Sequence, residues 1–215
     1  MKKAKLPQTT VARLPVYLRS LVFLAGRGVQ IVSSEELAQL AGTNAAQLRK
    51  DLSYLGEFGT RGVGYDVDQL INEVSKWLGL LRDRTVVIVG MGRLGGALVG
   101  YNGFTEKGFK IISVFDQDPS KIGKEVADMV VRHVSELTTI VSQNGGVDIG
   151  IIATPGAAAQ AVADLLVRSG VRGILNFAPI TIEVPDDVFV RQVDLSVELQ
   201  ILSYHLQKSR ESGSL

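Results

Sequence analysis

The fold of the larger part of this chain is decided by residues 85–95, TVVIVGMGRLG. The β-branched run predicts a buried strand, and the G-x-G-x-x-G order after it is typical of the first turn of a dinucleotide-binding fold. Gly90 allows the tight turn, Gly92 lets the backbone approach a pyrophosphate, and Gly95 permits close packing of helix on strand. Because the following helix would face the anion with its N-terminus, we predict nucleotide contacts from Gly90, Met91, Gly92, Arg93, Leu94 and Gly95.

An acidic residue stands where such folds hold a ribose. Asp116 follows the second predicted strand, residues 109–115, and lies 21 residues after Gly95. A carboxylate at this place accepts hydrogen bonds from ribose hydroxyls and repels a 2′-phosphate, so it favours NAD over NADP. Two simpler interpretations stay open: Asp116 only begins the turn of residues 116–119, and the glycines serve packing alone.

Further predicted strands alternate with helices, as in a doubly wound parallel sheet. They cover residues 85–89, 109–115, 147–153, 173–177 and 188–193. Because ligands of such sheets bind beyond the carboxyl ends of the strands, Thr154, Pro155 and Asn176 are further candidates for the nucleotide site. Thr154 has an equally simple interpretation as the N-cap of a helix that Pro155 begins.

The charge of the chain is unevenly distributed. Residues 1–65 hold nine Lys or Arg against four Asp or Glu, whereas the remaining 150 residues hold 14 against 18, so the net charge of +1 hides two different parts. A basic N-terminal part is compatible with a nucleic-acid partner, although like charges often only keep a surface soluble.

The basic part has the element order of a winged helix. We expect a helix from Pro15 to Gly26 and an extended piece at 30–32. Ser33 and Glu36 have the spacing of a capping box, which predicts a helix over 35–41, and Thr43 is a candidate cap for a further helix. A glycine-rich hairpin at 56–65 follows, with Arg61 near its tip, and then a connecting helix over 66–81. This order predicts a helix-turn-helix with a wing.

The second helix of this helix-turn-helix places its apolar residues on one face, so its polar residues are candidates for DNA binding. The candidates, together with the wing, are Gln47, Arg49, Lys50, Ser53, Tyr54, Arg61 and Gly62. We expect Arg49 and Lys50 at the major groove, Ser53 and Tyr54 on phosphates, and Arg61 in an A·T-rich minor groove. Alternatively, Arg49 pairs with Ser53 or a neighbouring acid. Lys2, Lys3, Lys5 and Arg13 are expected to add non-specific phosphate attraction.

Residues 195–208 predict a terminal helix with two adjacent apolar rows: Leu195, Leu199, Leu202 and Leu206, and beside them Val197, Ile201 and Tyr204. Two such rows indicate burial against a second subunit, and a wide core-facing stripe in a monomer is a comparable interpretation.

Several function classes are disfavoured. The chain has no cysteine, which excludes disulfides and thiolate chemistry, and shows neither a signal peptide nor a membrane span, so we expect a cytoplasmic protein. The only histidines, His133 and His205, lie in apolar surroundings, and no substrate domain is evident, so we predict no enzyme and no metal site. A small NAD-dependent oxidoreductase and a ligand-gated module similar to CoA-binding or potassium-transport regulatory domains remain as alternatives.

Five strings carry a resemblance that covers nearly the whole chain. They are QLRKDLSY at 47–54, GTRGVGY at 59–65, VGMGRLG at 89–95, NFAP at 176–179 and VDL at 193–195. Together they resemble the Rex family of redox-sensing transcriptional repressors. The resemblance implies a winged-helix DNA-binding domain with a connecting helix over residues 1–82, a Rossmann NAD(H)-binding domain over 83–193, and a C-terminal helix and tail over 194–215 that is exchanged within a homodimer.

The same resemblance implies how the protein works. A homodimer would bind inverted-repeat operators while the NADH/NAD+ ratio is low and leave the DNA when NADH binds, with the nucleotide as an effector that is not consumed. Arg19, Tyr101 and Asp194 are the implied switch residues: Asp194 pairs with Arg19 in the DNA-binding form, and Tyr101, also a candidate cofactor contact, approaches Asp194 in the NADH form. Leu195 stands where some members carry an aromatic residue, which puts stacking near the nicotinamide in doubt.

Overall fold

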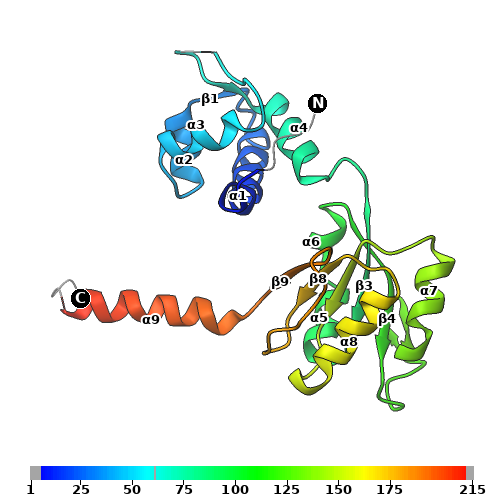
Figure 1. Ribbon diagram of the computed structural model, residues 1–215. Coiled ribbons are helices and arrows are strands. Elements are labelled where there is room, and N and C mark those ends of the chain that lie inside the picture. Colours follow the sequence, from blue (N-terminus) through cyan, green and yellow to red (C-terminus); the bar gives the residue numbers. More distant parts are fainter. Residues whose placement is uncertain (1–5, 61, 212–215) are drawn as a thin grey trace. The chain divides into compact units, whose positions relative to one another are not determined.

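The computed structural model describes residues 6–60 and 62–211. The chain forms two compact units, residues 1–82 and residues 83–215, here called the N-terminal and the C-terminal unit (Figure 1). Each unit has its own hydrophobic core.

The N-terminal unit is a small helical domain with a two-stranded sheet. Its elements are α1 (Gln8–Ala25), β1 (Ile31–Val32), α2 (Ser34–Leu40), α3 (Ala45–Ser53), β2 (Tyr65–Asp66) and α4 (Val67–Leu78). Its core gathers one face of each helix, including Tyr17, Leu37, Leu48 and Leu70, which are at most 1% exposed. The capping box predicted at Ser33 and Glu36 is confirmed.

Three details of this unit differ from the sequence prediction. The prediction that the first helix begins at Pro15 is wrong, because α1 begins at Gln8 and carries Pro15 inside. A proline inside a helix costs about 3 kcal/mol, and the turn before it is nevertheless held to the core by the buried residues Thr10 and Leu14. The cap of α3 is Asn44 rather than Thr43, since the Asn44 side chain accepts a 2.8 Å hydrogen bond from the Gln47 N–H.

The third difference concerns the wing. Among the described residues of the predicted hairpin, Thr60 and Gly64 form one antiparallel bridge, and β2 pairs with β1. Gly64 has a φ of 120°, and a Cβ there would lie 2.5 Å from the Val32 carbonyl oxygen. The close approach of this segment to β1 therefore requires glycine.

The C-terminal unit is a seven-stranded sheet in the order β5-β6-β4-β3-β7-β8-β9. The strands are β3 (Arg84–Val89), β4 (Phe109–Asp116), β5 (Glu125–Val126), β6 (Met129–His133), β7 (Ile149–Ile152), β8 (Gly173–Asn176) and β9 (Phe189–Gln192). All neighbours are parallel except β5 and β6. From β6 to β9 this is the 3-2-1-4-5-6 order of dinucleotide-binding folds. The strands β5 and β6 were not predicted from the sequence.

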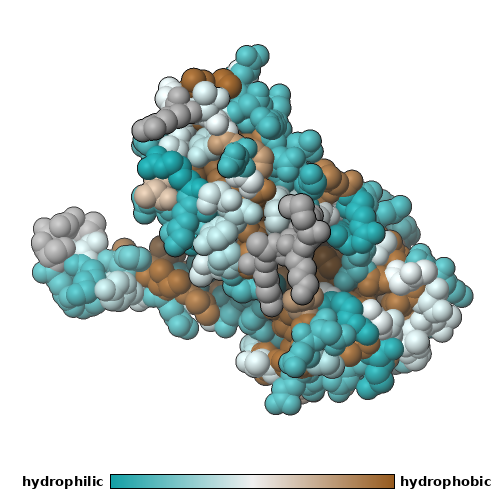
Figure 2. All heavy atoms as spheres, turned by 45° about the horizontal axis from the view of Figure 1, so that its top comes forward, coloured by the Kyte–Doolittle hydropathy of each residue, from teal (hydrophilic) through white to brown (hydrophobic). Residues whose placement is uncertain are grey.

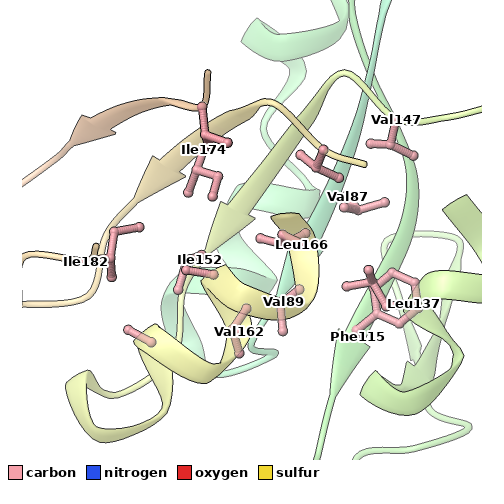
Figure 3. Packing of buried hydrophobic residues seen from close by; sticks show 14 of the residues in the cluster. Val87, Val89, Phe115, Leu137, Val147, Ile152, Val162, Leu166, Ile174 and Ile182 are labelled. Carbon is pink, nitrogen blue, oxygen red and sulfur yellow. The ribbon is translucent and has the colours of Figure 1, made fainter. Parts of the chain in front are cut away.

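Helices cover both faces of this sheet, and the central strand feeds a core on each side. These helices are α5 (Arg93–Val99), α6 (Asn102–Thr105), α7 (Leu137–Gln143) and α8 (Gly156–Arg168), with a short 3-10 turn at Val134–Glu136. A further helix, α9 (Leu195–Glu211), follows β9 and takes no part in these cores. Val87 and Val89 of β3 pack with α7 and α8 (Figure 3), while Val86 and Ile88 point to the face that α5 and α6 cover. This alternation is the period of two expected of a strand buried on both faces.

The terminal helix α9 differs from the other long helices, since no residue between Leu195 and Glu211 is buried. Both predicted apolar rows are exposed, with Leu195 and Leu199 each 67% exposed. Figure 2 shows apolar side chains on the surface of this helix. Among the helices that the structure describes, none has the length and apolar character that a bilayer crossing requires.

Candidate functional site

The glycine turn between β3 and α5 brings the predicted fingerprint to the carboxyl edge of the sheet. A Cβ at Gly90, whose φ is 104°, would lie 2.6 Å from the Ala153 carbonyl oxygen, and one at Gly95 would overlap the Gly90 carbonyl oxygen. These two glycines are thus required by packing. At Gly92, in contrast, such a Cβ would meet no described atom within 4 Å beyond the two neighbours in the chain. Its open side is where a ligand could approach the backbone.

A cavity of about 320 Å³ lies at this edge of the sheet. Its walls come from the ends of β3, β4 and β7 and from the start of α8. They include Gly90, Gly92, Asp116, Asp118, Lys121, Thr154, Pro155 and Val162. Because β4 and β7 lie on opposite sides of β3, the cavity is at the point where the strand order reverses, which is where doubly wound sheets bind ligands.

Asp116 is buried at the end of β4 and is occupied by protein donors. Its Oδ2 accepts from the Met91 N–H at 2.7 Å and from Lys121 Nζ at 2.9 Å, and its Oδ1 accepts from the Asp118 N–H at 2.9 Å. Burial disfavours the charged carboxylate, but the hydrogen bonds from Asp118, Lys121 and Met91 outweigh it and lower the pKa of Asp116. The carboxylate therefore stays ionised, begins the turn of residues 116–119, and lines the cavity as well.

Thr154 places a buried hydroxyl group at the cavity. The N-cap position of α8 is Pro155, so the alternative that Thr154 caps this helix is wrong. Its Oγ1 is buried and finds no hydrogen-bond partner among the residues that the structure describes, although Thr154 lines the cavity. Buried hydroxyls are nearly always hydrogen-bonded. A polar ligand in the cavity would satisfy this one.

Other predicted cofactor residues lie elsewhere. The Asn176 amide is fully buried and is engaged with the Ile180 carbonyl, Gln192 and the Ala178 N–H, so it holds the loop after β8 together. Met91 packs into the core, while Arg93 and Leu94 are exposed on the first turn of α5. Tyr101 is 54% exposed and packs edge-to-face on Phe104.

Lys121 is a site residue that was not predicted from the sequence. It lines the cavity, bonds to Asp116, and lies 3.7 Å from Asp118. The hydrogen bond to Asp116 raises the pKa of the Lys121 ammonium, whereas its burial acts in the opposite direction. Lys121 comes five residues after Asp116 in a turn without periodicity, and no pattern in the sequence marks it.

The helix-turn-helix presents most of its predicted DNA-binding residues. Lys50 and Ser53 of α3 are exposed, as is Tyr54, the C-cap residue of this helix, whereas Leu48 and Leu52 are buried on the opposite face. The Ser53 hydroxyl donates to the Lys50 carbonyl. The alternative of an Arg49–Ser53 pair is therefore not observed.

Arg49 has partners from the preceding helix. Its Nη1 donates to the Ser34 hydroxyl at 2.8 Å and to Glu35 at 3.1 Å, so an acid from α2 neutralises it. Both side chains of the ion pair are more than half exposed. Exposed pairs of this kind contribute at most about 1 kcal/mol, so DNA phosphates could displace Glu35.

A buried aspartate fixes α3 to α1. Asp51 is 0% exposed and accepts from Thr10 at 2.8 Å, Arg13 at 2.6 and 2.8 Å, Tyr17 at 2.7 Å, and Gln47 at 3.0 Å. Burial alone would raise its pKa, but the bonds from Arg13, Tyr17, Thr10 and Gln47 hold the pKa well below the usual range. Arg13 was expected to attract phosphates; in the structure it belongs to this ion pair instead.

The wing is described in part. Gly62 has a φ of 83° and open space around it, which suits a tight turn. Arg61, Lys2, Lys3 and Lys5 lie outside the described residues, so their predicted DNA contacts are not tested.

The implied switch residues belong to different units. Arg19 is exposed on α1 of the N-terminal unit, whereas Tyr101 and Asp194 belong to the C-terminal unit. Asp194 accepts from the Ser196 N–H at 2.9 Å at the start of α9. Hydrogen bonds from the Ser196 hydroxyl and backbone lower its pKa, so here it acts as a helix cap.

Comparison with known protein families matches both units. Residues 82–180 match the CoA binding domain, and residues 5–53 match the putative DNA-binding protein N-terminus. Two curated relatives are redox-sensing transcriptional repressors Rex. The one from Streptomyces avermitilis is 57% identical over 94% of this chain and 80% of the relative, and the one from Carboxydothermus hydrogenoformans is 50% identical over 97% and 100%.

Solved structures give the same result. RSP, a Rex-family repressor, has a TM-score of 0.90 at 37% identity and covers 99% of both chains. RSP in complex with β-NAD+ and operator DNA has a TM-score of 0.89 at 38% identity, covering 99% of this chain and 97% of that one. RSP in complex with β-NADH has a TM-score of 0.89 at 36% identity over 99% of both.

Fold and site therefore define a two-unit protein that joins a winged-helix DNA-binding domain to a Rossmann-type dinucleotide fold, as predicted for the fold class. This chain belongs to the Rex family of redox-sensing transcriptional repressors.

Proposed function

We propose that this protein is a transcriptional repressor that binds operator DNA and is released from it by NADH, so that it senses the NADH/NAD+ ratio. One observation carries the proposal: a single chain joins a cavity at the switch point of a dinucleotide fold to a helix-turn-helix with an exposed polar face. The relative RSP, similar over 99% of this chain, was solved with operator DNA and β-NAD+, and separately with β-NADH.

On the nucleotide side, the residues present fit NAD(H). The open side of Gly92 leaves room for a pyrophosphate, Asp116 stands at the ribose position, and the Thr154 hydroxyl has an unused bond for a polar group. Pro155 lines the same cavity, and Arg93, Leu94, Asn176 and Tyr101 stay further candidates for contact with the nucleotide. The nucleotide acts as a signal and is not consumed, so we propose that the protein is not an enzyme.

On the DNA side, α3 would enter the major groove. Lys50 is exposed and would contact bases or the groove edge, as would Arg49 once DNA has displaced Glu35. Gln47, Ser53 and Tyr54 would make contacts beside them. Arg61 and Gly62 of the wing would reach the minor groove. Binding of this kind weakens steeply with salt because phosphate contacts release counterions.

Two protomers would be joined through α9. Its exposed apolar rows have the character of an interface that is buried only in the assembly. We propose that the two chains of a homodimer exchange this helix. A two-fold dimer would read an inverted repeat, and a repressor that meets operator DNA in a bacterial cell would act in the cytoplasm.

The redox state would be read through charge. The oxidised nicotinamide ring is positively charged and the reduced ring is not, so an electrostatic element near the ring can distinguish them. We propose that Asp194 pairs with Arg19 in the DNA-binding form and meets Tyr101 in the NADH form. To drive a two-state equilibrium from 1:99 to 99:1, NADH must prefer the released form by about 10⁴-fold.

The proposal is tested by mobility shift. A labelled duplex is selected from a random-sequence pool by the protein itself, and NADH and NAD+ are titrated separately against the complex. We expect NADH to release the DNA at concentrations at which NAD+ does not. The Arg49→Ala Lys50→Ala variant should lose DNA binding and keep NADH binding. If the complex is indifferent to both nucleotides, the proposal is wrong.

A second candidate follows from the match of residues 82–180 to the CoA binding domain. The cavity would then take the nucleotide part of CoA. A thermal shift of the full chain with CoA, together with none with NADH, would support this candidate against the first.

A further inference from the structure

Asp116 cannot hold a ribose by itself. A carboxylate has about four acceptor sites, and three of them are taken in this structure, two on Oδ2 by Met91 and Lys121 and one on Oδ1 by Asp118. One site is left for a ligand hydroxyl. Because a ribose presents two adjacent hydroxyls, Asp116 can accept from only one of them, and the other is open to a second protein group.

Lys121 is the group in reach. Its Nζ lies 2.9 Å from Asp116 Oδ2, and it lines the same cavity. An ammonium has three donors, of which one serves Asp116, and Asp118 at 3.7 Å is a weak second partner. A hydroxyl that accepts from Lys121 while its neighbour donates to Asp116 would satisfy both side chains.

We propose that Lys121 is a ribose ligand of the nucleotide site and that its ion pair with Asp116 sets the preference for NADH over NADPH. The inference rests on the proposed function, since it takes a nicotinamide dinucleotide as the ligand. An ammonium this close to the ribose position is also within reach of a 2′-phosphate on the same hydroxyl. Asp116 prevents such binding in two ways: it repels the phosphate, and it keeps the ammonium engaged.

Lys121 is thus a latent phosphate ligand. Neutralising Asp116 removes the repulsion and frees the ammonium, and a charge-assisted hydrogen bond to phosphate is stronger than one to a hydroxyl. Asp118 keeps its charge near Lys121 and limits the gain. The specificity therefore belongs to the pair and not to the aspartate alone.

Binding of NADH and NADPH is measured directly, without DNA, by the fluorescence of the reduced nicotinamide. For Asp116→Asn we expect NADPH affinity to rise by about tenfold or more, as for one charged hydrogen bond, and for Asp116→Asn Lys121→Gln we expect this gain to disappear. If both variants bind NADPH equally well, or if neither gains affinity, the inference is overturned.

Lys121→Gln alone keeps the test decisive if Asp116→Asn disturbs the glycine turn. It leaves the bonds from Met91 and Asp118 to Asp116 in place and should weaken NADH binding by about fivefold or more. The matched control is Lys124→Gln, because Lys124 is exposed in the same loop and does not line the cavity. Equal NADH affinity of the two variants would contradict the role of Lys121. If the unaltered protein does not bind NADH at all, the proposed function itself fails, which is a distinguishable result.

Discussion

Replacement of Asp51 by alanine should destabilise the N-terminal unit severely. The substitution removes the acceptor for Tyr17 and Thr10, which are 0% and 1% exposed, so both hydroxyls lose this partner inside the core. A buried donor left without a partner costs about 1–3 kcal/mol. The Arg13 side chain is 31% exposed and can regain hydration, so it adds less. We expect a loss of about 3–5 kcal/mol, the usual cost of breaking a buried ion pair.

The assay exploits the single tryptophan of the chain, Trp77, which lies in α4 of the N-terminal unit. Its fluorescence during urea denaturation reports the unfolding of this unit. The control is Glu57→Ala, because Glu57 is exposed in the segment before the Thr60–Gly64 bridge and surface substitutions change stability by only about 0.5 kcal/mol. A loss below about 1 kcal/mol for Asp51→Ala, or a loss equal to that of the control, would refute the reasoning.

Three further predictions concern ionisation and glycine. The hydrogen bonds to Asp51 hold its pKa below the usual range against the effect of burial, so the stability that its charge contributes is complete above about pH 3.9 and is lost as the pH falls below that value. The difference in free energy of unfolding between the unaltered protein and Asp51→Asn should therefore shrink on acidification. A difference that stays constant down to about pH 2 would contradict this. Burial and then the bond to Asp51 raise the pKa of Tyr17 to about 12, so the unit should lose stability between about pH 10 and 12. The ultraviolet absorbance of tyrosinate should show a late phase that Tyr17→Phe reduces, and the remainder belongs to Tyr65, whose pKa burial also raises. A late phase of the same size in Tyr17→Phe and in the unaltered protein would count against this. Gly95→Ala should lower the melting temperature of the C-terminal unit, because the added Cβ overlaps the Gly90 carbonyl oxygen. Gly92→Ala adds its Cβ in open space, so this variant should keep the melting temperature and lose NADH affinity. Equal melting temperatures of the two variants would show that the turn is not packed as described.

Local patterns predicted much of the fold. Strands buried on both faces, such as β3 and β4, appear in the sequence as apolar β-branched runs, and the boundary at Arg82 separates periodic segments. The pattern failed where structure depends on distant contacts. In β6 only Val131 is buried, so its apolar signal is short, and it forms a strand because β4 offers it a partner.

The site shows the same limit. The glycine turn was predictable because its chemistry depends on neighbours in sequence. The Arg13–Asp51 ion pair was not predictable, because its two residues are 38 positions apart in the sequence. In addition, an Asp among the polar residues of a helix gives no sign that its side chain is buried. Likewise, Thr154 satisfies the local pattern of an N-cap, and only the backbone geometry at Pro155 shows that it is not one.

Whether NADH binding controls DNA binding by the same chain is tested most directly by measuring the free-energy coupling between the two ligands. The affinity for operator DNA is determined with and without saturating NADH, and the affinity for NADH with and without saturating DNA. We predict that each ligand weakens the other by the same factor, as linkage requires, within or above the common range of about 5- to 150-fold. A DNA affinity that NADH leaves unchanged would contradict a redox-sensing repressor.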